Sequence, residues 1–174
     1  VKKRHLTALV KTEAGLHLLM KALSAGWERS TALNDKPAIP LTEPLDNGWP
    51  GNIVLLTGCA SSPFWGLDNG IDWLGKYRDA FGDDLYAETM ALHDFAPQKA
   101  INELALEAAK HLGMKAVATC DAHFVAESDY KNHEVLLAIG RHQKMDDPKR
   151  WKFDSRLNWM RRPEEIVASY IKMG

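Results

Sequence analysis

The chain has 174 residues, of which 45% are hydrophobic and 26% are charged, and its formal net charge at pH 7 is -1. This composition is typical of one globular domain with a hydrophobic core. A net charge this close to zero excludes a general electrostatic attraction to nucleic acid or to an anionic membrane, although a local basic patch remains compatible with it.

The two cysteines, Cys59 and Cys120, form no C-x-x-C motif. Their spacing argues against a disulfide scaffold and against a cysteine-rich zinc module, and it favours a reducing, cytoplasmic location. No stretch of the sequence approaches the roughly 18 apolar residues that a membrane span requires, so we expect no membrane partner. The chain also begins without an initiator methionine, which suggests a fragment or a processed piece.

The first part of the chain predicts a strand, a helix and a long loop. Residues 4–10 read as a short strand, and a helix then opens at Thr12 and closes at Gly26, with apolar residues at helical spacing between them. Residues 27–51 contain several prolines and an Asn-Gly pair, which predict an extended loop. A loop of this length in a compact domain is usually functional or mobile.

Strands and helices alternate along the rest of the chain. The predicted elements are a buried strand at 52–56, a glycine-weakened helix at 64–81, a strand at 85–90, a helix at 97–112, a central strand leading to residue 119, a helix at 128–141, a β segment at 151–153 and a helix at 163–173. This alternation, with no repeat at a solenoid period, predicts an α/β fold with a parallel sheet or barrel.

The most informative short motif is D-x-H, formed by Asp121 and His123 just after the central strand. In an extended segment, residues i and i+2 point the same way, so both side chains could address one point in space. A carboxylate beside an imidazole is a plausible ligand pair for zinc, manganese or iron. The alternative is a turn aspartate and a surface histidine that follow a buried strand.

Other polar or soft residues also follow predicted strands, and in a parallel sheet those strand ends gather on one face. Cys59 could ligate a metal or fill a small apolar gap. Glu88 could be a metal ligand, an acceptor for a histidine N–H or a general base, or it could be an edge-strand glutamate that faces water. His93 could reach the same face from its loop, although a lone loop histidine is seldom functional. His5 would join the group if it lies on the first strand, and the alternative for it is a solvated side chain.

Several other chemistries find no support in the sequence. There is no G-x-S-x-G nucleophile elbow, no G-x-G-x-x-G motif and no P-loop. His133 lies near apolar residues, which favours a packing or capping role, and Cys120 is interpreted as a packing residue. The remaining histidines, His17, His111 and His142, look like surface residues of helices.

Five segments of the chain, taken in order, resemble the PHP (polymerase and histidinol phosphatase) domain of the alpha subunit of bacterial DNA polymerase III. They are residues 5–26, 53–62, 77–88, 117–124 and 133–140, and the resemblance extends to the closing R-R-P-E-E-I helix. What the resemblance implies for the fold is a distorted seven-stranded β/α (TIM-like) barrel with a multinuclear metal site at the C-terminal ends of the strands.

The resemblance also implies residue roles. It identifies His5, Cys59, Asp121 and His123 as divalent-metal ligands, with zinc, manganese or iron as the candidate metals, and it places Glu88 and His93 near the site as catalytic candidates. The activity that the resemblance implies for a complete site is metal-dependent phosphoester hydrolysis, seen as a 3′–5′ exonuclease in some members. DNA, reached through the full-length polymerase, and other replicative subunits are the implied partners.

Two departures from the family pattern limit these expectations. The family's opening H-x-H strand and its polymerase domains are absent, so we expect residues 1–174 to be a single partial PHP domain that cannot polymerise DNA by itself. Cys120 also replaces the asparagine of the usual T-N-D-x-H motif. The alternatives are a non-catalytic structural or interaction module of the replicative polymerase and a histidinol-phosphatase-like phosphomonoesterase. A barrel without its first strands exposes sheet edges, which predicts self-association.

Overall fold

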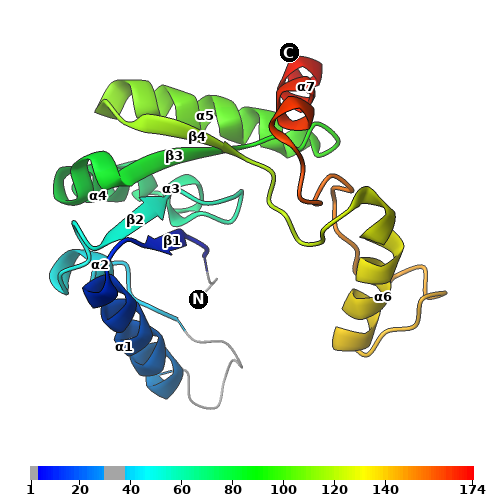
Figure 1. Cartoon of the computed structure of the whole chain (residues 1–174), viewed down its shortest axis with the longest axis horizontal. Coiled ribbons are helices and arrows are strands. Elements are labelled where there is room, and N and C mark those ends of the chain that lie inside the picture. The colour runs from blue at the N-terminus through cyan, green and yellow to red at the C-terminus, as the bar shows by residue number, and fades with distance from the viewer. Residues whose placement is uncertain (1–3, 30–37) are drawn as a thin grey trace. The chain divides into compact units, whose positions relative to one another are not determined.

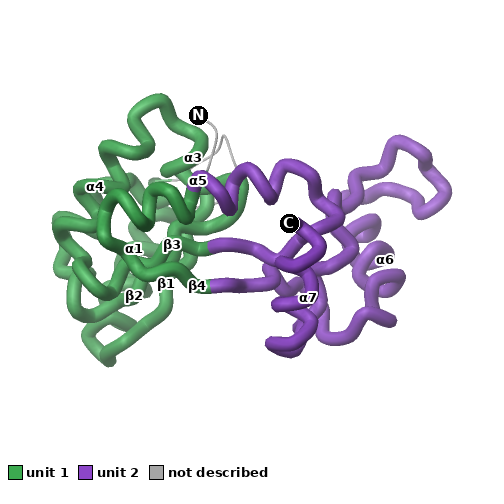
Figure 2. Tube along the Cα trace, turned by 90° about the horizontal axis from the view of Figure 1, so that it is seen from above, with its two compact units in different colours: residues 1–88, 105–117 green, residues 89–104, 118–174 purple. Residues whose placement is uncertain are grey.

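The computed structural model describes residues 4–29 and 38–174, and it has an α/β architecture (Figure 1). The chain divides into two compact units, which Figure 2 distinguishes by colour. Unit 1 comprises residues 1–88 and 105–117, and unit 2 comprises residues 89–104 and 118–174. Within the described ranges, no helix is both long enough and apolar enough to cross a membrane.

Four strands form one sheet in the order β1-β2-β3-β4, and their bounds are Thr7–Val10, Ile53–Leu56, Leu85–Met90 and Lys115–Thr119. β2 and β3 are parallel, as the alternation of elements predicts. β1, however, runs antiparallel to β2, with Thr7 opposite Leu56 and Val10 opposite Ile53, so the prediction of an all-parallel sheet is wrong for this strand. The long connection between β1 and β2 imposes no crossover direction, which is why the sequence pattern could not fix the orientation.

The sheet is open and mixed in the part of the chain that the structure describes, and no closed barrel is evident there. β4 is an end strand of this sheet, although its sequence predicts a central one, and its residues are mostly exposed or half-buried. The seven-stranded barrel therefore stays an expectation from the resemblance.

Most of the predicted helices are present, with small changes at their ends. Their bounds are α1 Glu13–Arg29, α2 Glu43–Asp46, α3 Pro63–Gly66, α4 Gly70–Phe81, α5 Ala96–Leu112, α6 Tyr130–Gly140 and α7 Pro163–Met173, with short 3-10 turns at Gly82–Asp84 and Glu127–Asp129. The predicted helix at 64–81 is interrupted between α3 and α4, and α1 continues past Gly26, which is a buried residue within the helix and not its end.

Two other predicted features also differ from the structure. The predicted β segment at 151–153 forms no strand; instead, Phe124 forms an isolated bridge with Trp159. Part of the predicted loop at 27–51, residues 30–37, lies outside the described residues. The rest of that stretch includes the last residues of α1 and the single turn of α2.

The core of unit 1 lies between the sheet and α4. Leu74, Tyr77 and Phe81 recur at helical spacing on α4 and are buried, and they belong to one cluster with Ile53 and Leu55 of β2. These alternate residues of β2 share one face of the strand, so the helical and strand periodicities meet at one apolar layer. The Tyr77 hydroxyl donates a hydrogen bond to the carbonyl oxygen of residue 41 at 2.8 Å, which satisfies the polar end of this buried ring.

Candidate functional site

Glu88 is a buried carboxylate in β3, with only 4% of its surface exposed. Its Oε2 accepts hydrogen bonds from the backbone N–H of Gly58 at 3.1 Å and from the Thr7 hydroxyl at 3.5 Å. Its own backbone N–H donates to Thr57 Oγ1 at 2.8 Å. The interpretation of Glu88 as a water-facing edge residue is therefore wrong, because the side chain faces β1 and the turn that follows β2.

His5 and Cys59 lie on two segments that pack backbone to backbone within unit 1. His5 precedes β1, and because β1 is antiparallel its beginning lies beside the C-terminal end of β2, where the His5 N–H donates to the Ser61 carbonyl oxygen at 3.0 Å. Gly58 has a φ of +82°, and a Cβ placed there would lie 2.6 Å from the His5 carbonyl oxygen, so this turn requires glycine. Cys59 comes next, half-buried, with its Sγ accepting from the Ser61 N–H at 3.4 Å.

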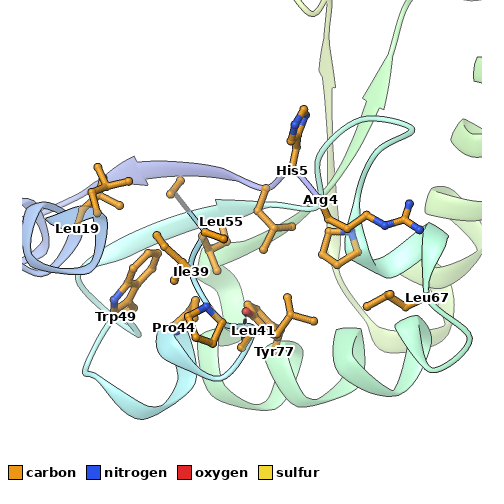
Figure 3. Close-up of a pocket in the computed structure, with 16 residues that line it drawn as sticks. Arg4, His5, Leu19, Ile39, Leu41, Pro44, Trp49, Leu55, Leu67 and Tyr77 are labelled. Atoms are coloured by element: carbon orange, nitrogen blue, oxygen red, sulfur yellow. Dashed lines mark hydrogen bonds between the residues drawn. The ribbon is translucent and has the colours of Figure 1, made fainter. Parts of the chain in front are cut away.

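An apolar cavity of about 530 Å³ in unit 1 adjoins the start of β1 (Figure 3). Its lining includes Leu55, Trp49 and Tyr77, together with Arg4. The ring of His5 points away from the labelled apolar residues in Figure 3. The imidazole is therefore directed away from the apolar core.

Asp121 and His123 are neighbours in unit 2, but they do not lie in the extended segment that the sequence predicts. β4 ends at Thr119, and Asp121 has a φ of +48°, so the motif forms a turn and not an extended segment. His123 Nδ1 lies 2.6 Å from the Asp121 carbonyl oxygen and 3.9 Å from Asp121 Oδ2. A carbonyl oxygen can only accept, so Nδ1 carries the proton and the lone pair of the neutral ring is on Nε2. This is the tautomer that can ligate a metal through Nε2.

Asn158 holds this turn in place, and sequence reasoning missed it. The side chain of Asn158 is buried, and its Nδ2 donates to the Asp121 carbonyl oxygen at 3.1 Å and to Oδ2 at 3.3 Å. The Asn158 carbonyl oxygen accepts from the His123 N–H at 2.7 Å. Because Asn158 follows the motif at a separation of 37 residues in an irregular segment, no local pattern pointed to it.

His123 and His133 lie in one cluster of aromatic rings in unit 2. The ring of His123 lies 4.6 Å from that of Phe153 and 6.1 Å from that of His133, and His133 also lies 5.1 Å from the ring of Phe124. Burial, together with the nearby His123, lowers the pKa of His133, while Glu134 opposes the shift. These ring contacts agree with the predicted packing role of His133.

His93 lies in unit 2, in the segment between β3 and α5. Its Nδ1 is 3.1 Å from the hydroxyl of Ser169 on α7, and the same hydroxyl accepts from Arg161 Nη1 at 2.6 Å. Burial lowers the pKa of His93, and the positive charges of Lys172 and Arg161 lower it further, while Asp94 acts in the opposite direction. The ring is thus neutral at pH values where an ordinary histidine begins to charge.

The predicted site residues are shared between the two units. Unit 1 holds His5, Cys59 and Glu88, whereas unit 2 holds His93 and the Asp121–His123 pair. Across residues 4–29 and 38–174, no group of three or more His, Cys, Asp or Glu side chains is arranged to hold a metal ion. The chemistry of the donors suits zinc, manganese or iron, and the metal site itself stays a prediction.

No family model matches the chain. The chain is 34% identical over 170 residues to the DNA polymerase III subunit alpha of Thermus aquaticus, an alignment that covers 94% of the chain and 14% of that protein. It is 30% identical over 168 residues to the subunit of the same name from Deinococcus radiodurans, covering 93% of the chain and 12% of the relative. The subunit from Aquifex aeolicus is 30% identical over 141 residues, which cover 78% of the chain and 12% of that protein.

The aligned regions are therefore a small part of much longer proteins. Similarity at this level over almost the whole chain, repeated in several organisms, reflects common descent. The chain is homologous, over most of its length, to a portion of the DNA polymerase III alpha subunit.

Proposed function

We propose that this chain is a PHP-domain portion of a DNA polymerase III alpha-like protein and that it supplies ligands to a metal-dependent phosphoesterase site. The observation that carries the proposal is the Asp121–His123 turn, in which a carboxylate lies beside an imidazole whose Nε2 lone pair is free. Homology to part of the polymerase subunit supports the same assignment. The partners under this proposal are DNA, reached through the full-length polymerase, and other replicative subunits.

The residues that would hold the metal are His5, Cys59, Asp121 and His123. A bound divalent metal would lower the pKa of a water molecule and neutralise charge on a phosphate. Within unit 1, Glu88 acts on the ligand set through the backbone, because its carboxylate binds the N–H of Gly58, immediately before Cys59. Within unit 2, Asn158 fixes Asp121 by donating to both its carbonyl oxygen and its carboxylate.

The two edge strands of the sheet support the proposed barrel. β1 and β4 end the open sheet, and the exposed residues of β4 include both of its first two positions. Edge strands of this kind are normally paired or covered, so further strands of a longer polypeptide are suitable partners for them.

A second candidate function is a non-catalytic structural module of the replicative polymerase. The observation that favours it is the row of exposed apolar side chains on α1, formed by Leu16, Met20, Leu23 and Trp27. In this case Glu88 and the Asp121–Asn158 contacts serve only to stabilise the turns after β2 and β4.

Hydrolysis assays distinguish these functions. The substrates are a single-stranded DNA labelled at its 3′ end and p-nitrophenyl phosphate, each with added manganese or zinc. We expect release of 3′ nucleotides by the chain and at least a tenfold loss in Asp121→Asn, since this variant removes a ligand charge. Asp146→Asn, a change of an exposed acid in the same unit, is the matched control and retains activity.

The possible results separate the candidates. Equal activity in Asp121→Asn and Asp146→Asn would contradict the site assignment. No hydrolysis of either substrate would support the structural module, and hydrolysis of the phosphomonoester alone would point to a small-molecule phosphatase.

A further inference from the structure

Ser169 is a buried hydroxyl that lies between a cation and an imidazole in unit 2. It is only 4% exposed, and its Oγ lies 2.6 Å from Arg161 Nη1 and 3.1 Å from His93 Nδ1. These two groups are the hydrogen-bond partners that the structure gives Ser169 Oγ within the described residues. The donor and acceptor in each of these two hydrogen bonds therefore determine which nitrogen of His93 carries its proton.

The first direction follows from the chemistry of arginine. A guanidinium has only donors, so Arg161 donates and Ser169 Oγ accepts. The hydroxyl hydrogen of Ser169 then needs an acceptor of its own, because a buried polar hydrogen without one is costly. Nδ1 of His93 is the acceptor in reach, and accepting through Nδ1 requires that the neutral ring carry its proton on Nε2.

Arg161 is fixed strongly enough to impose this direction. Its side chain is 6% exposed, its Nη2 donates to the Ala91 carbonyl oxygen at 2.6 Å, and its charge lies 5.6 Å from the ring centre of Trp159. Among the described residues it forms no ion pair, and its Nε is buried without a partner. The guanidinium is therefore a buried positive charge that favours an anion nearby and disfavours a second cation.

The acid beside His93 is already engaged elsewhere. Asp94 accepts from the Ser155 hydroxyl at 2.6 Å and from the backbone N–H of Arg156 at 2.7 Å. Lys172 of α7 adds a further positive charge to the surroundings of His93. The charges around the imidazole thus suit an anionic oxygen better than a divalent cation.

We propose that Arg161 and Ser169 are positioning residues that hold His93 in the Nε2–H tautomer, so that His93 donates a hydrogen bond to an anionic oxygen, such as that of a phosphate, and does not ligate a metal. His123 has the opposite arrangement, because a carbonyl oxygen holds its proton on Nδ1 and leaves Nε2 free. The two histidines thereby have different roles. The choice of phosphate as the anion rests on the proposed function, whereas the tautomer assignment is independent of it.

Nitrogen-15 NMR of histidine-labelled protein tests the tautomer directly. The resonances of His93 are assigned by their loss in His93→Gln. We expect the Nε2–H form to predominate in the wild-type chain and to lose its predominance in Ser169→Ala, which removes the hydroxyl that lies 3.1 Å from Nδ1. Ser169→Thr keeps the hydroxyl and retains the wild-type pattern.

The matched control is Ser155→Ala, which removes another buried serine of the same unit whose hydroxyl bonds Asp94. This variant should leave the His93 tautomer unchanged. A wild-type ring that is mainly in the Nδ1–H form, or a Ser169→Ala spectrum identical to wild type, would overturn the assignment.

Two titrations test the ligand class on the same sample. Inorganic phosphate should shift the Nε2 resonance of His93, and zinc should shift His123 while leaving the Nε2 proton of His93 in place. Loss of that proton on zinc addition, or no response to phosphate, would contradict the donor role. If instead zinc shifts neither ring while the tautomer and the phosphate response persist, the proposed metal site fails and the inference about His93 stands.

Discussion

At the scale of single residues, the chain buries several charged or polar groups whose partners are specific. Glu88 is the clearest case, because its carboxylate accepts from a backbone N–H and from a hydroxyl while almost all of its surface is covered. An ionised side chain in such a place is tolerated only when it is hydrogen-bonded. The turn that carries Cys59 therefore depends on a carboxylate from a strand that comes 30 residues later in the sequence.

Replacing Glu88 by glutamine should destabilise the chain by about 1–3 kcal/mol, since charge-assisted hydrogen bonds become neutral ones and an amide N–H₂ faces existing donors. Urea denaturation measures the change in the free energy of unfolding. Glu103→Gln, a change at an exposed position of α5, should have an effect within about 0.5 kcal/mol. Equal stabilities for the two variants would show that the Glu88 contacts contribute little.

The stability of the fold should depend on the protonation of His93. Its folded pKa lies below its ordinary value, mainly because of burial, so the unfolded chain binds a proton more readily than the folded one. The stabilisation is thus fully present above the unfolded pKa of about 6.5 and is lost as pH falls towards the folded pKa.

Urea unfolding at a series of pH values between about 7 and 5 checks this dependence. His93→Gln removes the titrating group, so its stability should fall less steeply than that of the wild type as the solution is acidified. His17→Gln, at an exposed position of α1, serves as the control and should keep the wild-type slope. An unchanged slope in His93→Gln would contradict the account of this residue.

At the scale of elements, close backbone approach fixes how α1 meets the sheet. Thr12 Oγ1 accepts from the N–H of Gly15 at 3.0 Å, which satisfies a free donor in the first turn. The same glycine packs against the chain just before β2, where a Cβ would lie 2.3 Å from the Asn52 carbonyl oxygen. Because that atom belongs to the backbone, it cannot move without displacing β2.

Two glycine-to-alanine substitutions should therefore have opposite effects. Gly15→Ala should destabilise the chain by about 1–3 kcal/mol through overpacking. Gly75→Ala, inside α4 where a Cβ would meet nothing within 4 Å, should stabilise it by about 0.5–1 kcal/mol. Thermal or urea unfolding measures both, and a destabilised Gly75→Ala or a neutral Gly15→Ala would contradict this description of the two helices.

Local patterns predicted the elements more accurately than the contacts between them. The last helix and the third strand have the predicted bounds, because their apolar periodicity and their proline or turn residues are local signals. Three other features depend on contacts between residues distant in sequence, so no local pattern predicts them. They are the antiparallel direction of β1, the burial of Glu88 and the hydrogen bonds from Asn158 to Asp121. The sequence therefore predicted the helices and strands better than it predicted the surroundings of the candidate residues.

At the scale of the whole molecule, exposed apolar residues suggest contacts beyond the described chain. Leu16, Met20, Leu23 and Trp27 recur at helical spacing on α1 and are all exposed. A continuous apolar stripe of this kind usually marks an interaction surface. Together with the end strands β1 and β4, it supports the expectation of self-association.

Sedimentation velocity over a range of concentrations tests this expectation. The wild-type chain should form larger species as concentration rises, and Leu16→Gln combined with Met20→Gln should weaken that association. Lys21→Gln changes an exposed polar position of the same helix and should behave like the wild type. A chain that is monomeric at every concentration would rule out self-association through this face.

The metal content of the chain tests the central claim most directly. Elemental analysis of protein purified without chelators or a metal-affinity tag should find zinc, manganese or iron at about one ion per chain or more. A content above one would fit sites in which two metals bind the phosphate. Asp121→Ala and His123→Ala should each lower that content while circular dichroism shows a nearly unchanged helical signal, and Asp146→Ala should retain the wild-type content. A wild-type chain without bound metal, or variants of Asp121 and His123 that bind as much as wild type, would contradict the assignment of these residues to a metal site.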